Sequence, residues 1–340
     1  MKKGFSLKKI FVPEEIIFAP TQECNLKCAH CFVSRTNEKL NIEKSLQFLK
    51  DAINDGVTRV GFSGGEPFLF LDFLCEISKA VVEAGVYFDK LMTNAVSFKD
   101  NACMKQAIEK IFNSGFDGTF GISFDAFHLQ KIEKVADFIK TVEAVYKERN
   151  HVSLICTKKD SLNSKTILML NQLAEKLGVS LKKDNSGFPV ELVYKDKLET
   201  FMNDMLLYDI IPIETIDFIA KDALDESAWQ SNSWFHEDFC SGPGHVYYIH
   251  SNGNVASCCG YANECDSLIL GNINTMSYKE ISEKAKISCK KGFLRIVYKT
   301  GLLKEAKKLE KKRYVFPGSG RTKENCLFCR YFLQEFRGER

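Results

Sequence analysis

The feature that most constrains the fold of this chain is a repeated alternation of amphipathic helices and short apolar strands. Four of the helical patterns end at a glycine, the residue that most easily takes the left-handed conformation just past a helix. Helices are predicted at 42–54, 73–83, 104–113, 129–148 and 166–177, and strands at 16–19, 57–62, 86–92, 119–124, 152–155 and 179–181. Such a repeat is typical of a parallel β/α barrel or sheet.

Three cysteines stand on the loop that follows the first predicted strand. Cys24, Cys28 and Cys31 have the spacing C-x3-C-x2-C. Thiolates are soft ligands that bind zinc or iron–sulfur clusters. Structural zinc sites and electron-transfer clusters use four protein ligands, so three leave one coordination position open for a substrate or cofactor. A zinc knuckle, or structural cysteines kept reduced in the cytosol, is the alternative interpretation of these three residues.

Polar segments follow the next three predicted strands, at the end where parallel β/α folds place their active sites. Residues 63–67 read Ser-Gly-Gly-Glu-Pro, residues 93–94 read Thr-Asn, and residues 123–125 read Ser-Phe-Asp. Two consecutive glycines let a backbone approach a ligand closely. A Gly-Gly turn is common by itself, and ordinary turn chemistry is the alternative for the polar residues. The position of the glycine pair behind a strand and a cysteine loop favours a ligand site.

The cysteine spacing, in the form CNLKCAHC, and the GGEP segment resemble the signature of the radical S-adenosylmethionine (radical SAM) superfamily. The resemblance implies that Cys24, Cys28 and Cys31 hold a [4Fe–4S] cluster whose fourth iron binds S-adenosylmethionine. It implies that the Gly-Gly-Glu segment holds the methionine amino group, and that the other strand-end residues meet the ribose and the carboxylate. The cofactor-binding residues expected in this way are Gly64, Gly65, Glu66, Pro67, Thr93, Asn94, Ser123 and Asp125. The adenine is expected near Phe32 and residues 154–157.

The same resemblance implies a reaction. In this family, an electron from the reduced cluster cleaves S-adenosylmethionine to methionine and a 5′-deoxyadenosyl radical, which removes a hydrogen atom from the substrate. The cofactor carries this reactivity, and the protein supplies position and excludes solvent. We therefore expect an enzyme that acts on a peptide or a small metabolite and receives electrons from a reductant such as flavodoxin or ferredoxin.

Cysteines reappear after residue 235, where the sequence changes character. Cys240 and Cys258 flank a predicted β-hairpin, and Cys326 and Cys329 form a C-x-x-C pair near the C-terminus. The hairpin has predicted strands at 246–249 and from 255, joined by a turn at 251–254. Four thiolates make a closed set of ligands for an iron–sulfur cluster, and zinc would accept the same set.

This region resembles the C-terminal extensions of radical SAM enzymes that hold auxiliary clusters, called SPASM with two clusters and twitch with one. The LGNI segment at 270–273 is typical of both. No cysteine follows Cys329, which favours the one-cluster form. The resemblance implies one auxiliary [4Fe–4S] cluster, which would accept an electron from the substrate radical in an oxidation, a cross-link or a dehydrogenation. The ligands expected for this cluster are Cys240, Cys258, Cys326 and Cys329.

The remaining cysteines allow a second reaction. Cys259 and Cys265 are each a neighbour of a ligand, an alternative ligand, or a thiol that returns a hydrogen atom to the substrate radical. In the last case the enzyme would be a radical peptide epimerase. Cys289 is left without an assignment. Cys75, Cys103 and Cys156 fall within predicted helices and strands, where we expect small buried hydrophobic residues.

Composition limits the other function classes. The formal net charge of +3 in 340 residues gives no reason to expect nucleic acid, and no apolar run is long enough to span a membrane. Thirteen cysteines, clustered in a chain without a predicted signal peptide, favour metal ligation over disulfides. We therefore expect a cytoplasmic protein of an anaerobic or low-oxygen cell. A non-catalytic zinc or iron–sulfur binding protein is the rival of another class.

The predicted domain organisation follows from these motifs. Residues 1–12 are an N-terminal extension, and residues 13–234 form a radical SAM core with a partial (β/α)6 barrel. Residues 235–340 form a small α+β domain of the twitch or SPASM type with a β-hairpin. The basic stretch at 290–313 is interpreted as solvated helix packed on one side. Residues 194–234 are the least readable part, and the end of the barrel is expected there.

Overall fold

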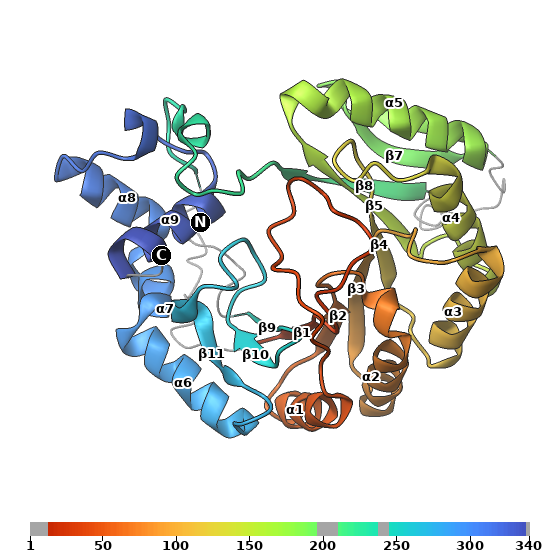
Figure 1. Ribbon diagram of the computed structural model, residues 1–340, viewed down its shortest axis with the longest axis horizontal. Coiled ribbons are helices and arrows are strands. Elements are labelled where there is room, and N and C mark those ends of the chain that lie inside the picture. Colours follow the sequence, from red (N-terminus) through yellow and green to blue (C-terminus); the bar gives the residue numbers. More distant parts are fainter. Residues whose placement is uncertain (1–12, 196–209, 237–244, 338–340) are drawn as a thin grey trace, which may run out of the picture. The chain divides into compact units, whose positions relative to one another are not determined.

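A computed structural model describes residues 13–195, 210–236 and 245–337 (Figure 1). The chain divides into two compact units. The first, called the β/α unit here, comprises Ala19–Lys39 and Val60–Phe218, and the second, called the C-terminal unit, comprises Met1–Phe18, Leu40–Arg59 and Ile219–Arg340. The segment 40–59 thus belongs with the C-terminal unit.

The β/α unit contains an open sheet with the strand order β2-β3-β4-β5-β8-β7-β6. Strands β3, β4, β5 and β8 are successively parallel, while β7 is antiparallel to β8 and β6 is antiparallel to β7. The strands are β2 (Arg59–Phe62), β3 (Tyr87–Thr93), β4 (Thr119–Ser123), β5 (Val152–Lys158), β6 (Val179–Lys183), β7 (Pro189–Tyr194) and β8 (Ile210–Asp217). The predicted α/β class is confirmed, and the sheet, whose β2 to β5 and β8 part matches a partial barrel, does not close.

Helices alternate with these strands, as the sequence pattern predicts. They are η1 (Pro67–Phe70), α2 (Leu71–Ala84), α3 (Asn101–Asn113), α4 (Ile132–Tyr146) and α5 (Asp160–Leu177), and Figure 1 shows α2 to α5 along the outer side of the strands. Gly85 and Gly178 follow α2 and α5 with φ of +65° and +72°, so the glycines end these helices as expected. Phe120, Phe68 and Phe138 pack together in the core between helix and sheet.

The prediction that the last strand, at residues 179–181, is parallel to its neighbour is wrong. Residues 179–181 lie in β6, which is antiparallel to β7, and the place beside β5 belongs to β8. The reason is the short connection after β6, because a parallel neighbour needs a crossover of a dozen residues or more. Asp184 accepts hydrogen bonds from the backbone N–H groups of Ser186 and Phe188, and Gly187 has φ of +83°. This tight turn makes β7 antiparallel to β6. Strand β8 lies in the segment 194–234, for which no elements were predicted from the sequence.

The C-terminal unit has its own strands, in the order β11-β10-β9-β1. Strands β1 (Glu15–Phe18) and β9 (Val246–Ile249) are parallel, and β10 (Asn254–Ala256) pairs antiparallel with both β9 and β11 (Ile269–Asn272). The predicted hairpin is confirmed: the backbone N–H of His250 donates to Asn254 O at 2.9 Å, and Gly253 in the turn has φ of +89°. The glycine is needed there because this backbone conformation is strained for other residues.

Helices complete the C-terminal unit. They are α1 (Ile42–Asn54), η3 (Glu226–Trp229), η4 (Asp266–Leu268), α6 (Tyr278–Lys291), α7 (Phe293–Arg295), the π-helical η5 (Ile296–Thr300), α8 (Leu302–Lys311), η6 (Pro317–Ser319) and α9 (Asn325–Arg337). The rings of Tyr247 on β9, Phe48 of α1 and Tyr278 of α6 pack against one another, and the Tyr278 hydroxyl donates to Asp55 at 2.7 Å. The basic stretch at 290–313 is thus divided among several helical segments.

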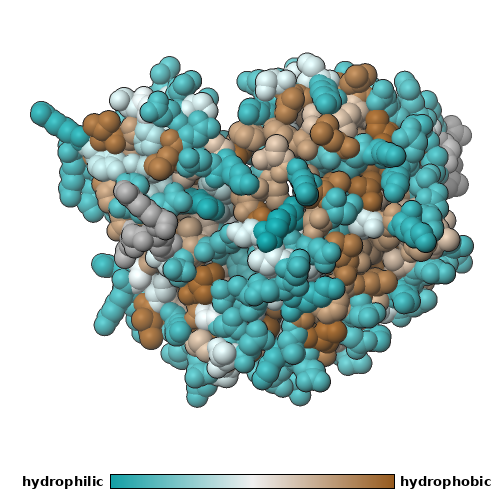
Figure 2. All heavy atoms as spheres, in the orientation of Figure 1, coloured by the Kyte–Doolittle hydropathy of each residue, from teal (hydrophilic) through white to brown (hydrophobic). Residues whose placement is uncertain are grey.

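In the described part of the chain, no helix is both long and apolar enough to cross a membrane. The face seen in Figure 2 is largely hydrophilic, with hydrophobic residues in separate patches. Isolated exposed hydrophobic residues such as Tyr87 and Leu168 are ordinary for a protein surface.

Candidate active site

A cavity of about 200 Å³ lies in the β/α unit and collects residues from the cysteine loop and from the ends of strands. Of the predicted residues, Cys24, Cys28, Cys31, Phe32, Gly64, Gly65, Thr93, Asn94 and Ser123 line it. Leu26, His30, Val33, Arg35, Ser63, Met92, His128 and Ile216 complete the lining. The predicted residues are up to a hundred positions apart in sequence, and the strand order places them around one space.

Two backbone hydrogen bonds fasten the glycine pair to the cysteine loop. Gly65 N–H donates to Thr21 O at 2.9 Å, and Glu66 N–H donates to Glu23 O at 2.8 Å. A Cβ atom on Gly65 would lie 2.1 Å from the carbonyl oxygen of Glu23, so no side chain fits between the two segments. Glycine at position 65 therefore serves the contact between backbones, and it fixes where the cysteine loop leaves the sheet.

Glu66 lies behind the wall of the cavity and supports it. Its carboxylate is fully buried and accepts hydrogen bonds from the Thr93 hydroxyl at 2.8 Å, from Asn94 N at 2.8 Å and from Phe68 N at 3.3 Å. The bond to Asn94 N ties the GGEP segment to the end of β3. Glu66 and Pro67 are not among the lining residues, and what Glu66 contributes in this structure is the position of Thr93 and Asn94.

Glu66 should make the stability of the protein depend on pH. Burial raises the pKa of Glu66 from its ordinary value of 4.5 to about 7, against the opposing effect of its three hydrogen bonds. The folded protein therefore binds this proton more tightly than the unfolded chain does. The resulting stabilisation is fully present below about pH 4.5 and is lost as the pH rises through about 7, by up to about 3 kcal/mol.

Urea denaturation of the native chain and of Glu66→Gln measures this effect. We expect the free energy of unfolding of the native chain, minus that of the variant, to fall as the pH rises from about 5 to about 7.5. A difference that stays constant over this range would contradict the raised pKa.

Asp125 is the second buried carboxylate at a strand end. It is fully buried, and its Oδ1 accepts hydrogen bonds from His128 Nδ1 at 2.8 Å and from Phe127 N at 2.9 Å, while its Oδ2 accepts one from Thr157 N at 2.8 Å. Burial by itself acts to raise the pKa of Asp125, but the hydrogen bonds from His128 and the backbone outweigh it and lower the pKa. Asp125 does not line the cavity, whereas His128 does.

Two histidines that line the cavity, His30 and His128, were not predicted as site residues from the sequence. The ring of His30, between Cys28 and Cys31, lies 4.9 Å from the ring of His128 and 4.6 Å from that of Phe127. Burial, followed by the neighbouring His128, lowers the pKa of His30 to about 4, so this ring is neutral at pH 7. The available sequence signals were a histidine inside the cysteine motif and another three residues after Asp125.

Two of the predicted auxiliary ligands face each other in the C-terminal unit. A Cβ atom on Gly260 would lie 3.4 Å from Cys326 Sγ and 3.7 Å from Cys258 Sγ, so both sulfurs lie beside this glycine. Gly260 N–H also donates to Cys258 Sγ at 3.2 Å. Cys329 is buried one turn further along α9. Cys240 lies outside the described residues.

The other cysteines differ in exposure. Cys265, Cys289 and Cys156 are buried, Cys75 is half-buried and Cys259 is exposed. The prediction that Cys103 is buried is wrong, because its side chain is exposed. It lies in the first turn of α3, where its backbone N–H donates to the capping residue Asp100 and its side chain is on the solvent face.

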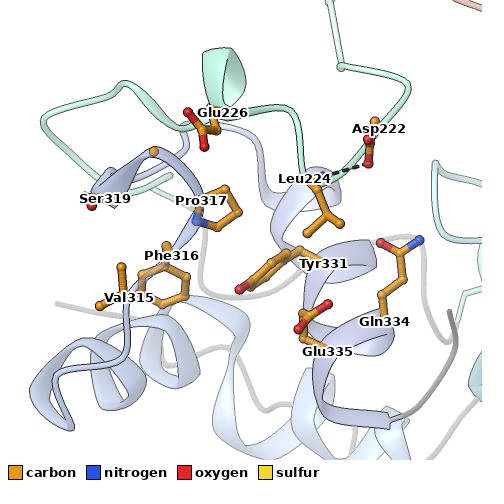
Figure 3. A pocket seen from close by; sticks show the side chains of 11 residues that line it. Asp222, Leu224, Glu226, Val315, Phe316, Pro317, Ser319, Tyr331, Gln334 and Glu335 are labelled. Atoms are coloured by element: carbon orange, nitrogen blue, oxygen red, sulfur yellow. Dashed lines mark hydrogen bonds between the residues drawn. The ribbon is translucent and has the colours of Figure 1, made fainter.

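A larger cavity, of about 950 Å³, lies in the C-terminal unit (Figure 3). Tyr331, Gln334 and Glu335 of α9 face it on one side, and Phe316 and Pro317 face it on another. None of the predicted metal ligands or cofactor residues in the described part of the chain lines it. The chemistry therefore selects the smaller cavity as the candidate active site, despite the difference in volume.

Comparison with known families agrees with the geometry. The profile of the radical SAM superfamily matches residues 18–157, and that of the SPASM iron–sulfur cluster-binding domain matches residues 240–309. The chain belongs to the radical SAM superfamily. The first match contains the cysteine loop and every residue expected to bind the cofactor, and the second contains Cys240 and Cys258 but ends before Cys326.

Individual relatives of this radical SAM protein match it over short stretches. An S-adenosylmethionine-dependent nucleotide dehydratase of Siniperca chuatsi is 34% identical over 64 residues, which are 18% of each chain. The antilisterial bacteriocin subtilosin biosynthesis protein AlbA of Bacillus subtilis (strain 168) is 35% identical over 79 residues, which are 21% of this chain and 18% of that protein. The alignments thus span less than a fifth of each of these two relatives.

A solved structure shares the fold. Native anSMEcpe with bound AdoMet and Cp18Cys peptide is similar with a TM-score of 0.52 and 17% identity, over 96% of this chain and 97% of that one. At this identity the likeness shows the fold and nothing more about the reaction.

A radical SAM protein with a SPASM domain carries a [4Fe–4S] cluster with S-adenosylmethionine and auxiliary iron–sulfur binding, and the donors in the cavity fit the first of these. Burial, and then the neighbouring Cys31 and Cys24, raise the pKa of Cys28 to about 11, so a positive metal centre is needed to hold its thiolate. In the described ranges, no three His, Cys, Asp or Glu side chains converge on a single ion. Thiolates are the ligands that hold iron–sulfur clusters, and the three cysteines of the triplet line this one cavity.

Proposed function

We propose that this protein is a radical SAM enzyme that reductively cleaves S-adenosylmethionine and abstracts a hydrogen atom from a peptide or small-metabolite substrate. The observation that carries the proposal is the single cavity lined by Cys24, Cys28 and Cys31 together with the glycine pair and Asn94. A structural metal site gains nothing from an open coordination position beside a cavity. This argument opposes the rival of a non-catalytic zinc or iron–sulfur protein.

Each group of residues has a proposed task. Cys24, Cys28 and Cys31 would hold the cluster and leave one iron open, which supplies the electron and the binding position for S-adenosylmethionine. The backbone of Gly64 and Gly65 lines the cavity and would meet the amino group of the methionine moiety. The side chains at the ends of β3 and β4, those of Thr93, Asn94 and Ser123, would bind the remaining polar groups. Glu66 acts through Thr93 and Asn94, which it holds in place.

The C-terminal cysteines determine the net reaction in this proposal. One electron and S-adenosylmethionine yield methionine, and the abstracted hydrogen atom leaves with 5′-deoxyadenosine. The substrate radical then loses a proton, and an auxiliary cluster at Cys240, Cys258, Cys326 and Cys329 would accept its electron. A ferredoxin or flavodoxin would supply the first electron. If Cys259 or Cys265 returned a hydrogen atom to the substrate instead, the product would be an epimer.

The names of the relatives point to more than one substrate class, since that of the Siniperca chuatsi relative contains a nucleotide. The name of the Bacillus subtilis relative places it in the biosynthesis of a bacteriocin, and the solved structure of similar fold has a peptide bound. The proposal for this chain therefore keeps both substrate classes, a peptide and a small metabolite.

Formation of 5′-deoxyadenosine by the anaerobically reconstituted chain tests the proposal. With dithionite as reductant we expect 5′-deoxyadenosine and methionine in equal amounts from the native chain, and none from Cys28→Ala. Candidate peptides should increase the rate, and mass spectrometry in deuterated water separates the products. Loss of two hydrogen atoms indicates oxidation, and uptake of one deuteron at carbon indicates epimerisation. A native chain that contains its clusters and forms no 5′-deoxyadenosine would refute the proposal.

A further inference from the structure

Asp125 and His128 form a pair in which the fully buried carboxylate fixes the partly buried imidazole. The Asp125 carboxylate is fully buried, accepts four hydrogen bonds from protein donors and does not line the cavity. Its bond to His128 Nδ1 is 2.8 Å long, and the His128 side chain is 13% exposed. A carboxylate accepts hydrogen bonds and cannot donate one, so Nδ1 must carry the proton.

This arrangement leaves the other ring nitrogen as the functional group. With the proton held at Nδ1, neutral imidazole presents a lone pair at Nε2 and acts as a hydrogen-bond acceptor. In the described part of the chain, His128 Nε2 has no hydrogen-bond partner, and His128 lines the cavity that also contains the cysteine triplet. The acceptor is therefore available to a donor on a bound molecule.

The ring is also held by packing. His30, which comes from the cysteine loop, lies edge-on to His128 at 4.9 Å with an interplanar angle of 79°, and the ring of Phe127 also packs against His30, at 4.6 Å. Phe127 itself is stacked on Phe218 at 5.4 Å. Besides Asp125 and His30, the charged or ionisable groups around this cavity are the three cysteines and Arg35, whose Nη2 donates to Cys31 Sγ at 3.3 Å. No carboxylate of the lining competes for a donor on the ligand.

We propose that His128 Nε2 accepts a hydrogen bond from a hydroxyl or amino group of the adenosyl moiety of S-adenosylmethionine, and that Asp125 is a positioning residue that acts only through His128. This inference rests on the proposed function and adds a contact to it. The adenosyl moiety is the part of the cofactor that offers such donors away from the methionine amino group, which is assigned to Gly64 and Gly65. The inference also changes the expected role of Asp125, which was predicted from the sequence to contact S-adenosylmethionine directly.

A matched pair of variants isolates Nε2. In His128→Asn the amide nitrogen can replace Nδ1 and keep the bond to Asp125, but nothing replaces Nε2. In His128→Gln the amide oxygen can reach the place of Nε2 and restore an acceptor. The probes are S-adenosylmethionine, 5′-methylthioadenosine, which has the adenosyl moiety alone, and methionine. Their dissociation constants are measured by anaerobic equilibrium dialysis with the reconstituted chain.

We expect His128→Asn to weaken the binding of S-adenosylmethionine and 5′-methylthioadenosine by about three- to tenfold, which is the value of one hydrogen bond, and to leave methionine unchanged. His128→Gln should recover most of the loss. Asp125→Asn should weaken both nucleosides, and the double variant with His128→Asn should be no weaker than the worse single variant, because the two residues act as one unit.

Three results would overturn the inference. Unchanged binding of 5′-methylthioadenosine to His128→Asn would show that the adenosyl moiety does not use Nε2, even if turnover of a substrate fell. Equal losses in His128→Asn and His128→Gln would assign the effect to packing. Additive losses in the double variant would refute the positioning role of Asp125. His151→Asn, a change outside the cavity, is the control for a general effect of replacing a histidine in this unit. If the native chain neither binds nor cleaves S-adenosylmethionine, the proposed function itself is refuted. This outcome is distinct from the three above, which all require binding by the native chain.

Discussion

A chain in which Cys24, Cys28 and Cys31 are all replaced by alanine is expected to bind about four irons, where the native chain binds about eight. The native value corresponds to one [4Fe–4S] cluster at the triplet and one at the C-terminal cysteines. The same variant is expected to lose all formation of 5′-deoxyadenosine, because no iron remains beside Gly64 and Gly65. Iron and sulfide analysis after anaerobic reconstitution measures the first effect, and chromatography of the nucleoside products measures the second.

Two controls make the iron count informative. Cys103→Ala removes an exposed cysteine on α3, outside the cavity, and should leave about eight irons. Cys326→Ala together with Cys329→Ala should leave about four, with cleavage of S-adenosylmethionine retained. A native chain with about four irons that falls to none in the triplet variant would exclude an auxiliary [4Fe–4S] cluster. The electron acceptor of the proposed oxidation would then be absent, and the epimerase alternative would become the better hypothesis.

Gly65→Ala is expected to have the second largest effect, through the backbone. The added Cβ would lie 2.1 Å from Glu23 O and 2.7 Å from the carbonyl carbon of Gln22, and neither atom belongs to a side chain that could turn away. The two segments must separate, which breaks the hydrogen bonds from Gly65 and Glu66 to the cysteine loop. We expect a loss of about 3 kcal/mol in the free energy of unfolding and a loss of most of the iron at the triplet.

Denaturation in urea and iron analysis measure these effects together. Gly187→Ala is the matched control, because an added Cβ at this turn meets nothing within 4 Å. Its φ of +83° makes alanine strained, so about 1 kcal/mol should be lost without any loss of iron. Full iron content and native stability in Gly65→Ala would contradict the close contact between the glycine pair and the cysteine loop.

The sequence predicted those parts of the fold that local chemistry controls. Helix α1 begins and ends at the predicted residues, and Gly85 and Gly178 end α2 and α5 with the positive φ that glycine tolerates. The hairpin around Gly253 follows from its turn residues in the same way. The place of β8 did not follow, because strand order depends on which strand pairs with β5, and no local pattern records a pairing across the sheet.

The same distinction applies to the candidate site. The cysteine triplet and Gly64-Gly65 were predicted because their spacing in sequence is a signal in itself, and the structure places them around one cavity. The different positions of Asp125 and His128 could not be predicted, because burial decides which of two polar side chains faces the cavity. Glu66 is a parallel case, since its three hydrogen bonds turn a predicted contact residue into a support for Thr93 and Asn94.

The backbone bonds between the cysteine loop and residues 65–66 have a consequence for the order of biosynthesis. The three cysteines leave the ribosome early, but the strand ends that complete the cavity, at Thr93 and Ser123, are synthesised much later. The hydrogen bonds that hold the loop are made by protein atoms alone, so the loop takes its place as the β/α unit folds. We therefore expect cluster insertion to follow the folding of the β/α unit, unlike in a zinc finger, whose metal is required for folding.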